Sequence, residues 1–248
     1  LDNYEIMKKH NASMKIIISP AKQMKPVDLN LEMSEPIFLN KANELVLHIQ
    51  NLEYDTLKKY LNCSDSLALQ AYELYQSFEQ QETSPALLTY AGIQYQYMHA
   101  QIFDDQELSF LQDHLYILSA LYGLLKPLDE IRCYRLEMQA KIPFRLYDFW
   151  KDNLANEIKD PIILNLASEE YAKCIRKYKK LIDVRFVEKH KEKYVEKGVY
   201  AKMARGAMVR FIAINRIENI EEIKNFKEFD YEYAPEMSHE FLYVFKRN

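Results

Sequence analysis

Short apolar runs along the chain alternate with longer segments in which apolar residues recur every three or four positions. The runs are rich in β-branched and aromatic residues, which is typical of buried strands. One of them, MKIIIS, is followed by Pro20, which cannot donate a hydrogen bond to a strand ladder. The runs predict strands at residues 14–19, 86–90, 115–123 with a turn at Gly123, 134–138, 161–168 and 241–247.

Apolar positions at helical spacing predict helices in much of the remaining chain. Residues 36–52 place Phe38, Ala42, Leu45 and Ile49 on one face. An acidic first turn, which the helix dipole favours, supports a helix at 104–114. Further helices are predicted at 65–80, at 146–158, after Ser168 and at 204–217, and an antiparallel hairpin is predicted from 179–190 and 193–203.

The order of these elements predicts an α+β fold. Strands alternate with helices, but without a regular βαβ repeat, and no linker-like stretch divides residues 14–248. We therefore expect a single compact domain in which helices surround a mixed β-sheet. Residues 1–13 are polar and without pattern, and we interpret them as an appended, vector-derived remnant outside the fold.

Charge is unevenly distributed along the chain, although its formal net value is only −4. Residues 41–115 hold three Lys or Arg against eleven Asp or Glu, whereas residues 171–216 hold fourteen against four. The acidic total argues against a nucleic-acid-binding protein. The basic block argues for one, because a local surplus of positive charge creates a surface field that attracts anions.

Several classes of site are not supported by any motif. The chain has no Walker or dinucleotide-binding glycine pattern, and its histidines show no metal-ligand spacing, so we expect no cofactor and no metal. Its three cysteines form no CxxC pair, which suits the reducing cytoplasm. No apolar run is long enough to span a bilayer, so we expect a cytoplasmic protein without a membrane partner.

Three short stretches carry candidate chemistry. In ISPAK, Ser19 and Lys22 follow a strand end, where ligands often bind, although this stretch taken alone favours the interpretation of Lys22 as an ordinary surface lysine. The stretch YGLLKPLDEIRCYRLEM contains cations and tyrosines that can bind a phosphate, or that simply form an Arg–Glu pair beside a turn. Its candidate residues are Lys126, Arg132, Tyr134, Arg135 and Glu137.

The third stretch is YAKMARGAMVRF, at residues 200–211. On a helix Lys202 and Arg205 are neighbours, and Arg210 returns close to the same face. Gly206 costs a helix about 1 kcal/mol relative to alanine, and its missing Cβ permits close approach of a backbone or ligand. The alternatives are a solvated basic helix that packs on the sheet and a surface that binds an anion.

Taken in order, these stretches closely resemble the YaaA family of bacterial peroxide stress proteins. The resemblance rests on MKIIISPAK, LSALYGLLKPLDEIRCYRLEM, LYDFW, NLASEEY, AKMARGAMVRF and FLYVFKR. The chain departs from the family where Gln139 replaces a glycine after RLEM, and LYGLLKP has one glycine where a DNA-binding hairpin commonly has two. Through NLASEEY the resemblance adds Asn165, Ser168 and Tyr171 to the candidate residues.

The resemblance implies a cytoplasmic protein that helps bacteria to survive peroxide and is linked to limiting free intracellular iron. It also implies binding of the duplex DNA backbone through a positively charged, basic cleft, and it brings no established reaction. The alternative hypothesis is an enzyme acting on a nucleotide, nucleobase or other anionic small molecule. One narrow pocket that collects the candidate residues would favour the enzyme, and an open groove would favour DNA binding.

Overall fold

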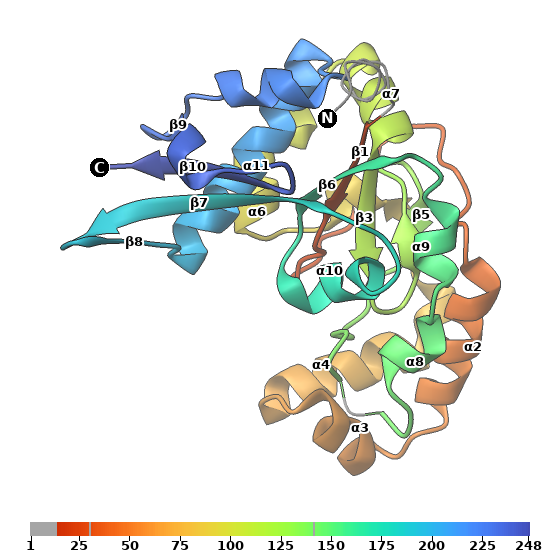
Figure 1. Cartoon of the computed structure of the whole chain (residues 1–248). Coiled ribbons are helices and arrows are strands. Elements are labelled where there is room, and N and C mark those ends of the chain that lie inside the picture. The colour runs from red at the N-terminus through yellow and green to blue at the C-terminus, as the bar shows by residue number, and fades with distance from the viewer. Residues whose placement is uncertain (1–13, 30, 141) are drawn as a thin grey trace.

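The computed structural model describes residues 14–29, 31–140 and 142–248, so the interpretation of residues 1–13 lies outside the described residues. Its framework is a sheet in which neighbouring strands β3, β1, β6, β7 and β10 run parallel (Figure 1). Their bounds are Leu115–Ser119, Met14–Ile18, Ile162–Leu166, Ile182–His190 and Leu242–Arg247. Three short strands pair antiparallel to this set: β4 (Gly123–Leu125) with β3, β8 (Lys193–Val195) with β7, and β9 (Glu232–Tyr233) with β10.

The central strands are buried on both faces. Every residue of β3 and β6 is buried, and Ile16, Ile17 and Ile18 of β1 are fully inaccessible to solvent. A parallel strand covered on both faces has no solvent side, so its sequence is continuously apolar. This burial explains why MKIII and IILNL show no alternation, and it confirms both as strands.

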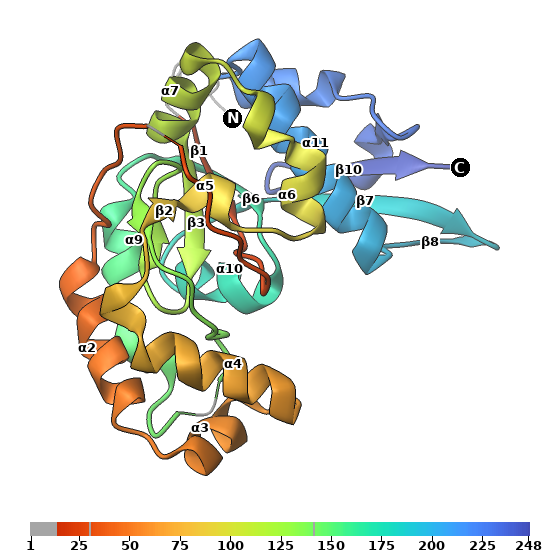
Figure 2. The same cartoon turned by 180° about the vertical axis from the view of Figure 1, so that it is seen from behind.

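Helices cover the two faces of the sheet. Figures 1 and 2 show α6 (Ile93–Met98) and α11 (Gly198–Asn215) on one face and α10 (Glu169–Arg176) on the other. The predicted mixed sheet with surrounding helices, and with it the α+β class, is confirmed. Within the described chain no helix combines the length and the apolar character that crossing a membrane requires.

A group of helices lies beyond one end of the sheet. It contains α2 (Leu39–Gln50), α3 (Tyr54–Leu61), α4 (Asp65–Gln76) and α8 (Leu146–Trp150) (Figure 1). Trp150 ties this group to the sheet because its indole N–H donates to the Ala120 carbonyl at 3.0 Å. Gly123 turns with φ of +75°, and a Cβ there would lie 2.7 Å from the Trp150 ring. The predicted turn at Gly123 therefore also makes room for the only tryptophan.

The helix predicted at 104–114 is confirmed as α7 (Asp105–His114). Its first turn carries a capping box, in which the Asp104 carboxylate accepts from the Glu107 N–H and the Glu107 carboxylate accepts from the Asp104 N–H. Such reciprocal bonds satisfy two backbone donors that a helix start leaves unpaired. The local sequence was therefore sufficient to place this helix.

Three predicted strands differ from the structure. Residues 86–90 form the short helix α5 (Ala86–Thr89), because a brief buried apolar run does not distinguish a strand from a helix. Residues 134–138 belong to no strand, since Met138 already lies in a turn, and the Arg135 carbonyl accepts a hydrogen bond from the Tyr75 side chain instead. The predicted hairpin is confirmed as β7 paired antiparallel with β8, but its second strand is shorter than predicted, because β8 ends at Val195 and α11 begins at Gly198 rather than at residue 204.

Gly206 is required where α11 crosses α6. A Cβ on Gly206 would lie 2.0 Å from the Gln94 carbonyl oxygen and 3.0 Å from the Met98 nitrogen. The missing side chain thus lets two helix backbones touch, and it opens no space for a ligand. The sequence allowed either a backbone or a ligand to approach Gly206 closely, and in the structure the backbone of α6 does so.

Replacing Gly206 by alanine tests this contact. Alanine should favour the helix by about 1 kcal/mol, but overpacking against α6 should outweigh this gain and lower the free energy of unfolding by about 2–3 kcal/mol. Urea denaturation measures the difference. Gly198→Ala is the matched control, because nothing lies within 4 Å of a Cβ built there, and its effect should stay within about 0.5 kcal/mol. Equal stability of the two variants would contradict this account of Gly206.

Candidate functional site

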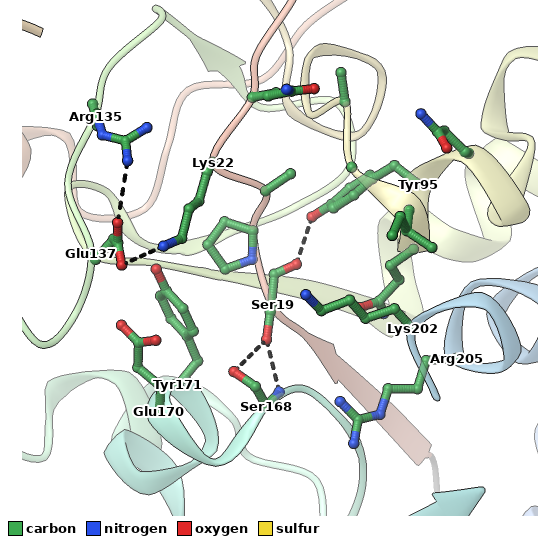
Figure 3. A pocket seen from close by; sticks show the side chains of 18 of the residues that line it. Ser19, Lys22, Tyr95, Arg135, Glu137, Ser168, Glu170, Tyr171, Lys202 and Arg205 are labelled. Carbon is green, nitrogen blue, oxygen red and sulfur yellow. Dashed lines mark hydrogen bonds and ion pairs between the residues drawn. The ribbon is translucent and has the colours of Figure 1, made fainter. Parts of the chain in front are cut away.

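A pocket of about 550 Å³ opens beyond the carboxyl ends of β1 and β6 (Figure 3). The chain passes from β1 to β3 on one side and from β6 to β7 on the other, so the strand order reverses between them. In open α/β sheets the crevice at such a reversal is the usual ligand site. The pocket is lined by residues 19–23, 91–96 and 134–137 together with Ser168, Glu170, Tyr171, Lys202 and Arg205.

Ser19 and Ser168 join the two strand ends at the base of this pocket. The Ser168 N–H donates to Ser19 Oγ at 2.8 Å, and Ser19 Oγ donates to Ser168 Oγ at 3.1 Å. The Tyr95 hydroxyl donates to the Ser19 carbonyl at 2.8 Å. Ser168 is the N-cap residue of α10, so the positive end of that helix dipole faces the pocket.

Lys22, Arg135 and Glu137 form an ionic cluster in the pocket wall. Lys22 Nζ lies 2.9 Å from Glu137 Oε2, and Arg135 Nη2 lies 3.6 Å from Glu137 Oε1. The Lys22 side chain is 65% exposed, so water screens its pair and an incoming anion can compete for the ammonium group. Arg135 is more buried, and its Nε finds no hydrogen-bond acceptor among the described residues.

Glu170 adds a second carboxylate to the pocket. Burial raises the pKa of its carboxyl, and the nearby negative charge of Glu137 raises it further. A hydrogen bond from the Gln139 N–H lowers this pKa and so offsets part of the increase. That N–H donates to Glu170 Oε1 at 3.3 Å. The two carboxyl groups thus differ, since Glu137 is held between two cations and Glu170 has no ion pair in the described chain.

α11 contributes Lys202 and Arg205 to the opposite side of the pocket (Figure 3). Arg205 is largely buried and donates to Glu196 Oε1 at 3.1 Å. Burial lowers the pKa of its guanidinium, and the negative charges of Glu196 and Asp183 raise it. The group remains a cation at neutral pH, because the ordinary pKa of arginine lies far above 7. Lys202 is exposed and has no ion pair within the part of the chain that the structure describes.

Two buried tyrosines, Tyr134 and Tyr171, form part of the pocket lining. The Tyr134 hydroxyl lies 2.8 Å from the Tyr90 hydroxyl and 2.7 Å from Ser119 Oγ. Burial raises the pKa of Tyr134 to about 12, and it also raises the pKa of Tyr171. Both phenols therefore stay protonated at neutral pH and present donors and aromatic surface, not charge.

Three candidate cations lie outside the pocket. Arg132 Nε donates to the Gln81 carbonyl at 3.2 Å, and Arg210 pairs with Glu228. Lys126 belongs to a turn in which its backbone N–H donates to Asp129 at 2.8 Å. The other four, Lys22, Arg135, Lys202 and Arg205, are brought together from segments that lie far apart in the sequence.

Asn165 and Gly206 also lie outside the lining. The Asn165 amide donates to Asp183 Oδ1 at 2.8 Å, and its carbonyl oxygen accepts from the Ala167 N–H at 2.9 Å. These bonds shape the turn between β6 and α10. Gly206 affects the pocket indirectly, because its missing side chain lets α11 lie close to α6. Both are supports for the pocket and not parts of its surface.

Two of the three thiols are poorly placed for reaction with peroxide, and the third, Cys63, is half-buried outside the pocket lining. Cys133 and Cys174 are buried, and burial raises the pKa of both, to about 12 for Cys174. The thiolate is the nucleophilic form of cysteine, so neither thiol is activated. Among the described residues no group of three His, Cys, Asp or Glu side chains forms a metal cluster.

Two residues of the pocket, Tyr95 and Glu170, were not among the site residues predicted from the sequence. Glu170 was visible only as an acidic residue in the first turn of a helix, a position that the helix dipole explains by itself. Tyr95 belongs to YAGIQYQY, which precedes no recognisable strand end. A useful signal for Glu170 was its place two residues after Ser168, directly beyond a buried strand.

Comparison with known proteins gives closely similar sequences over nearly the whole chain. The chain is 43% identical over 244 residues to a UPF0246 protein of Lachnoclostridium phytofermentans, covering 94% of this chain and 96% of the relative. A UPF0246 protein of Desulfitobacterium hafniense is 45% identical over 244 residues, covering 94% and 97%. A third, from Agathobacter rectalis, is 43% identical over 246 residues, covering 94% and 99%.

A family model described as peroxide stress protein YaaA matches residues 14–237. The match includes every segment that lines the pocket, from the loop after β1 to the first half of α11. It confirms the resemblance on which the sequence analysis relied and supports a role in peroxide stress. The chain belongs to the peroxide stress protein YaaA family.

Proposed function

We propose that this chain serves the cytoplasmic peroxide stress response by binding, and acting on, a small anionic molecule in the pocket between β1 and β6. The observation that carries the proposal is the convergence of Lys22, Arg135, Lys202 and Arg205 on one cavity. Only Glu137 and Glu170 among the lining residues carry negative charge. Four cations against two carboxylates favour an anionic ligand.

The dimensions of the pocket support a small ligand. Its volume of about 550 Å³ is within the range of sites for nucleotide-sized molecules. A DNA duplex presents an extended row of phosphates and needs a long open groove. Ser19 and Ser168 follow the ends of β1 and β6 and are hydrogen-bonded to each other, and Tyr95 of α6 donates to the Ser19 carbonyl, which suits precise positioning of a ligand.

The implied link to free iron is, in this proposal, indirect. The described residues bring no three iron-binding side chains together, and lysine and arginine, which dominate the pocket, repel a metal cation. A reaction on a small anionic molecule that itself binds iron, or that signals its abundance, would give such a link.

Binding of ribose 5-phosphate tests the pocket. Lys202→Ala should weaken this binding about tenfold or more, because a charge-assisted contact with the phosphate contributes about 1.5–3 kcal/mol. Isothermal titration calorimetry measures the affinity. Lys193→Ala, which removes an equal charge from the exposed strand β8 outside the pocket lining, should have no effect. Absence of binding to the unaltered protein at millimolar concentration would refute the proposal.

Duplex DNA is a second candidate partner, favoured by a different surface. Lys189, Lys191 and Lys193 are exposed on the hairpin of β7 and β8, which projects from the domain (Figure 1). Within the described chain these three lysines form no ion pair. Unpaired surface lysines on a projecting hairpin suit contacts with a phosphate backbone, which carry little sequence preference.

Fluorescence anisotropy with a DNA duplex across a salt series tests this candidate. Replacing Lys189, Lys191 and Lys193 by alanine should reduce the slope of log affinity against log salt by about 2–3, as expected for the loss of three phosphate contacts. Lys202→Ala should leave the slope unchanged if DNA binds at the hairpin. Salt-insensitive binding, or none at low salt, would exclude a DNA-backbone role.

A further inference from the structure

Most polar groups of the pocket are already paired with one another. Ser19 bonds to Ser168, and Lys22 and Arg135 share Glu137. Arg205 is paired with Glu196, which lies outside the lining. A ligand that enters the pocket therefore meets few charged groups that still lack an ionic partner.

Two side chains of opposite charge remain. Lys202 has no ion pair within the described residues, and neither has Glu170, which receives only backbone hydrogen bonds from the segment at 138–139. Figure 3 shows Lys202 entering from α11 on one side of the pocket and Glu170 lying on the other, with Ser19 and Ser168 between them in this view. A ligand with a single anionic group would satisfy the lysine and leave the carboxylate facing it unpaired.

We propose that the ligand has two ends, a phosphate bound by Lys202 and an amino-bearing heterocycle bound by Glu170, as in a nucleoside monophosphate such as AMP. This inference rests on the proposed function and specifies its ligand. The phosphate also meets the positive end of the α10 dipole beside Ser168. The exocyclic amine donates to the carboxylate, a charge-assisted bond that a base without N–H donors cannot make.

The lining between the two ends suits a ring system. Tyr171 places an aromatic side chain between Glu170 and the centre of the pocket in Figure 3, and Pro20 and Leu136 add apolar surface. Sites for ligands of this size are mainly apolar with a few polar groups that fix orientation. The sugar and base would contact these apolar side chains, while Lys202 binds the phosphate and Glu170 binds the amine of the base.

Glu170 is not isolated from other titrating groups. The charges of Glu137 and Lys22 act on it, and Tyr171 and Glu169 flank it on α10. The Tyr147 hydroxyl of α8 donates to its backbone carbonyl. Since these neighbours complicate any pH profile, the proposal is tested by substitution at constant pH.

Calorimetric titration of three ligands into four proteins separates the two ends. The ligands are AMP, adenosine, and purine riboside 5′-monophosphate, which lacks the amine. Lys202→Ala should weaken AMP binding about tenfold or more and leave adenosine unchanged. Glu170→Gln should weaken AMP binding by a similar factor, because a neutral amide is a poorer acceptor than a carboxylate, and should leave purine riboside 5′-monophosphate within about twofold.

Glu169→Gln is the matched control for Glu170, because it removes the same charge from the same helix turn outside the pocket lining. It should leave all three affinities unchanged, and thermal denaturation of each variant verifies folding. If AMP and purine riboside 5′-monophosphate bind equally well and Glu170→Gln has no effect, the two-ended ligand is wrong while the anionic pocket stands. If no phosphate compound binds, the proposed function itself fails.

Discussion

The contact between α6 and α11 at Gly206 is the constraint on which the pocket depends. A single methyl group at this position would collide with the Gln94 carbonyl, so the distance between the two helices is set by the absence of a side chain. Both helices line the pocket, α6 through residues 93–96 and α11 through Lys202 and Arg205. The glycine therefore determines how far these two cations reach toward the strand ends, although it touches no ligand itself.

The basic block at 171–216 does not form one surface. Arg176 binds Asp183 through two hydrogen bonds, Arg205 pairs with Glu196, and Arg210 pairs with Glu228, so part of its charge is neutralised internally. α10 begins at the pocket, and its cationic end lies one helix length of about 12 Å away. The remaining lysines divide between the pocket, the end of α10 and the β7–β8 hairpin. Linear charge density is thus a poor guide to a binding face.

Membership of a peroxide stress family does not make this chain a thiol peroxidase. Such chemistry needs an accessible thiolate, and burial raises the pKa of the Cys133 and Cys174 thiols, while the half-buried Cys63 lies outside the pocket lining. The polar site instead collects lysine, arginine, serine and glutamate at the reversal point of a parallel sheet. The proposal of a charged small-molecule ligand rests on this composition.

The sequence by itself determined the elements with strong local signals: the buried strands MKIII and IILNL, the capped helix α7, and the order of the family motifs. It also indicated Lys22, Arg135, Glu137, Lys202 and Arg205 as candidates. Local pattern failed at ALLT and YRLEM, where burial and long-range hydrogen bonds, not periodicity, set the backbone. Only the tertiary structure decided which candidates meet. Pairing across the sheet brings Ser19 to Ser168, 149 positions apart, and no spacing along a chain encodes that distance.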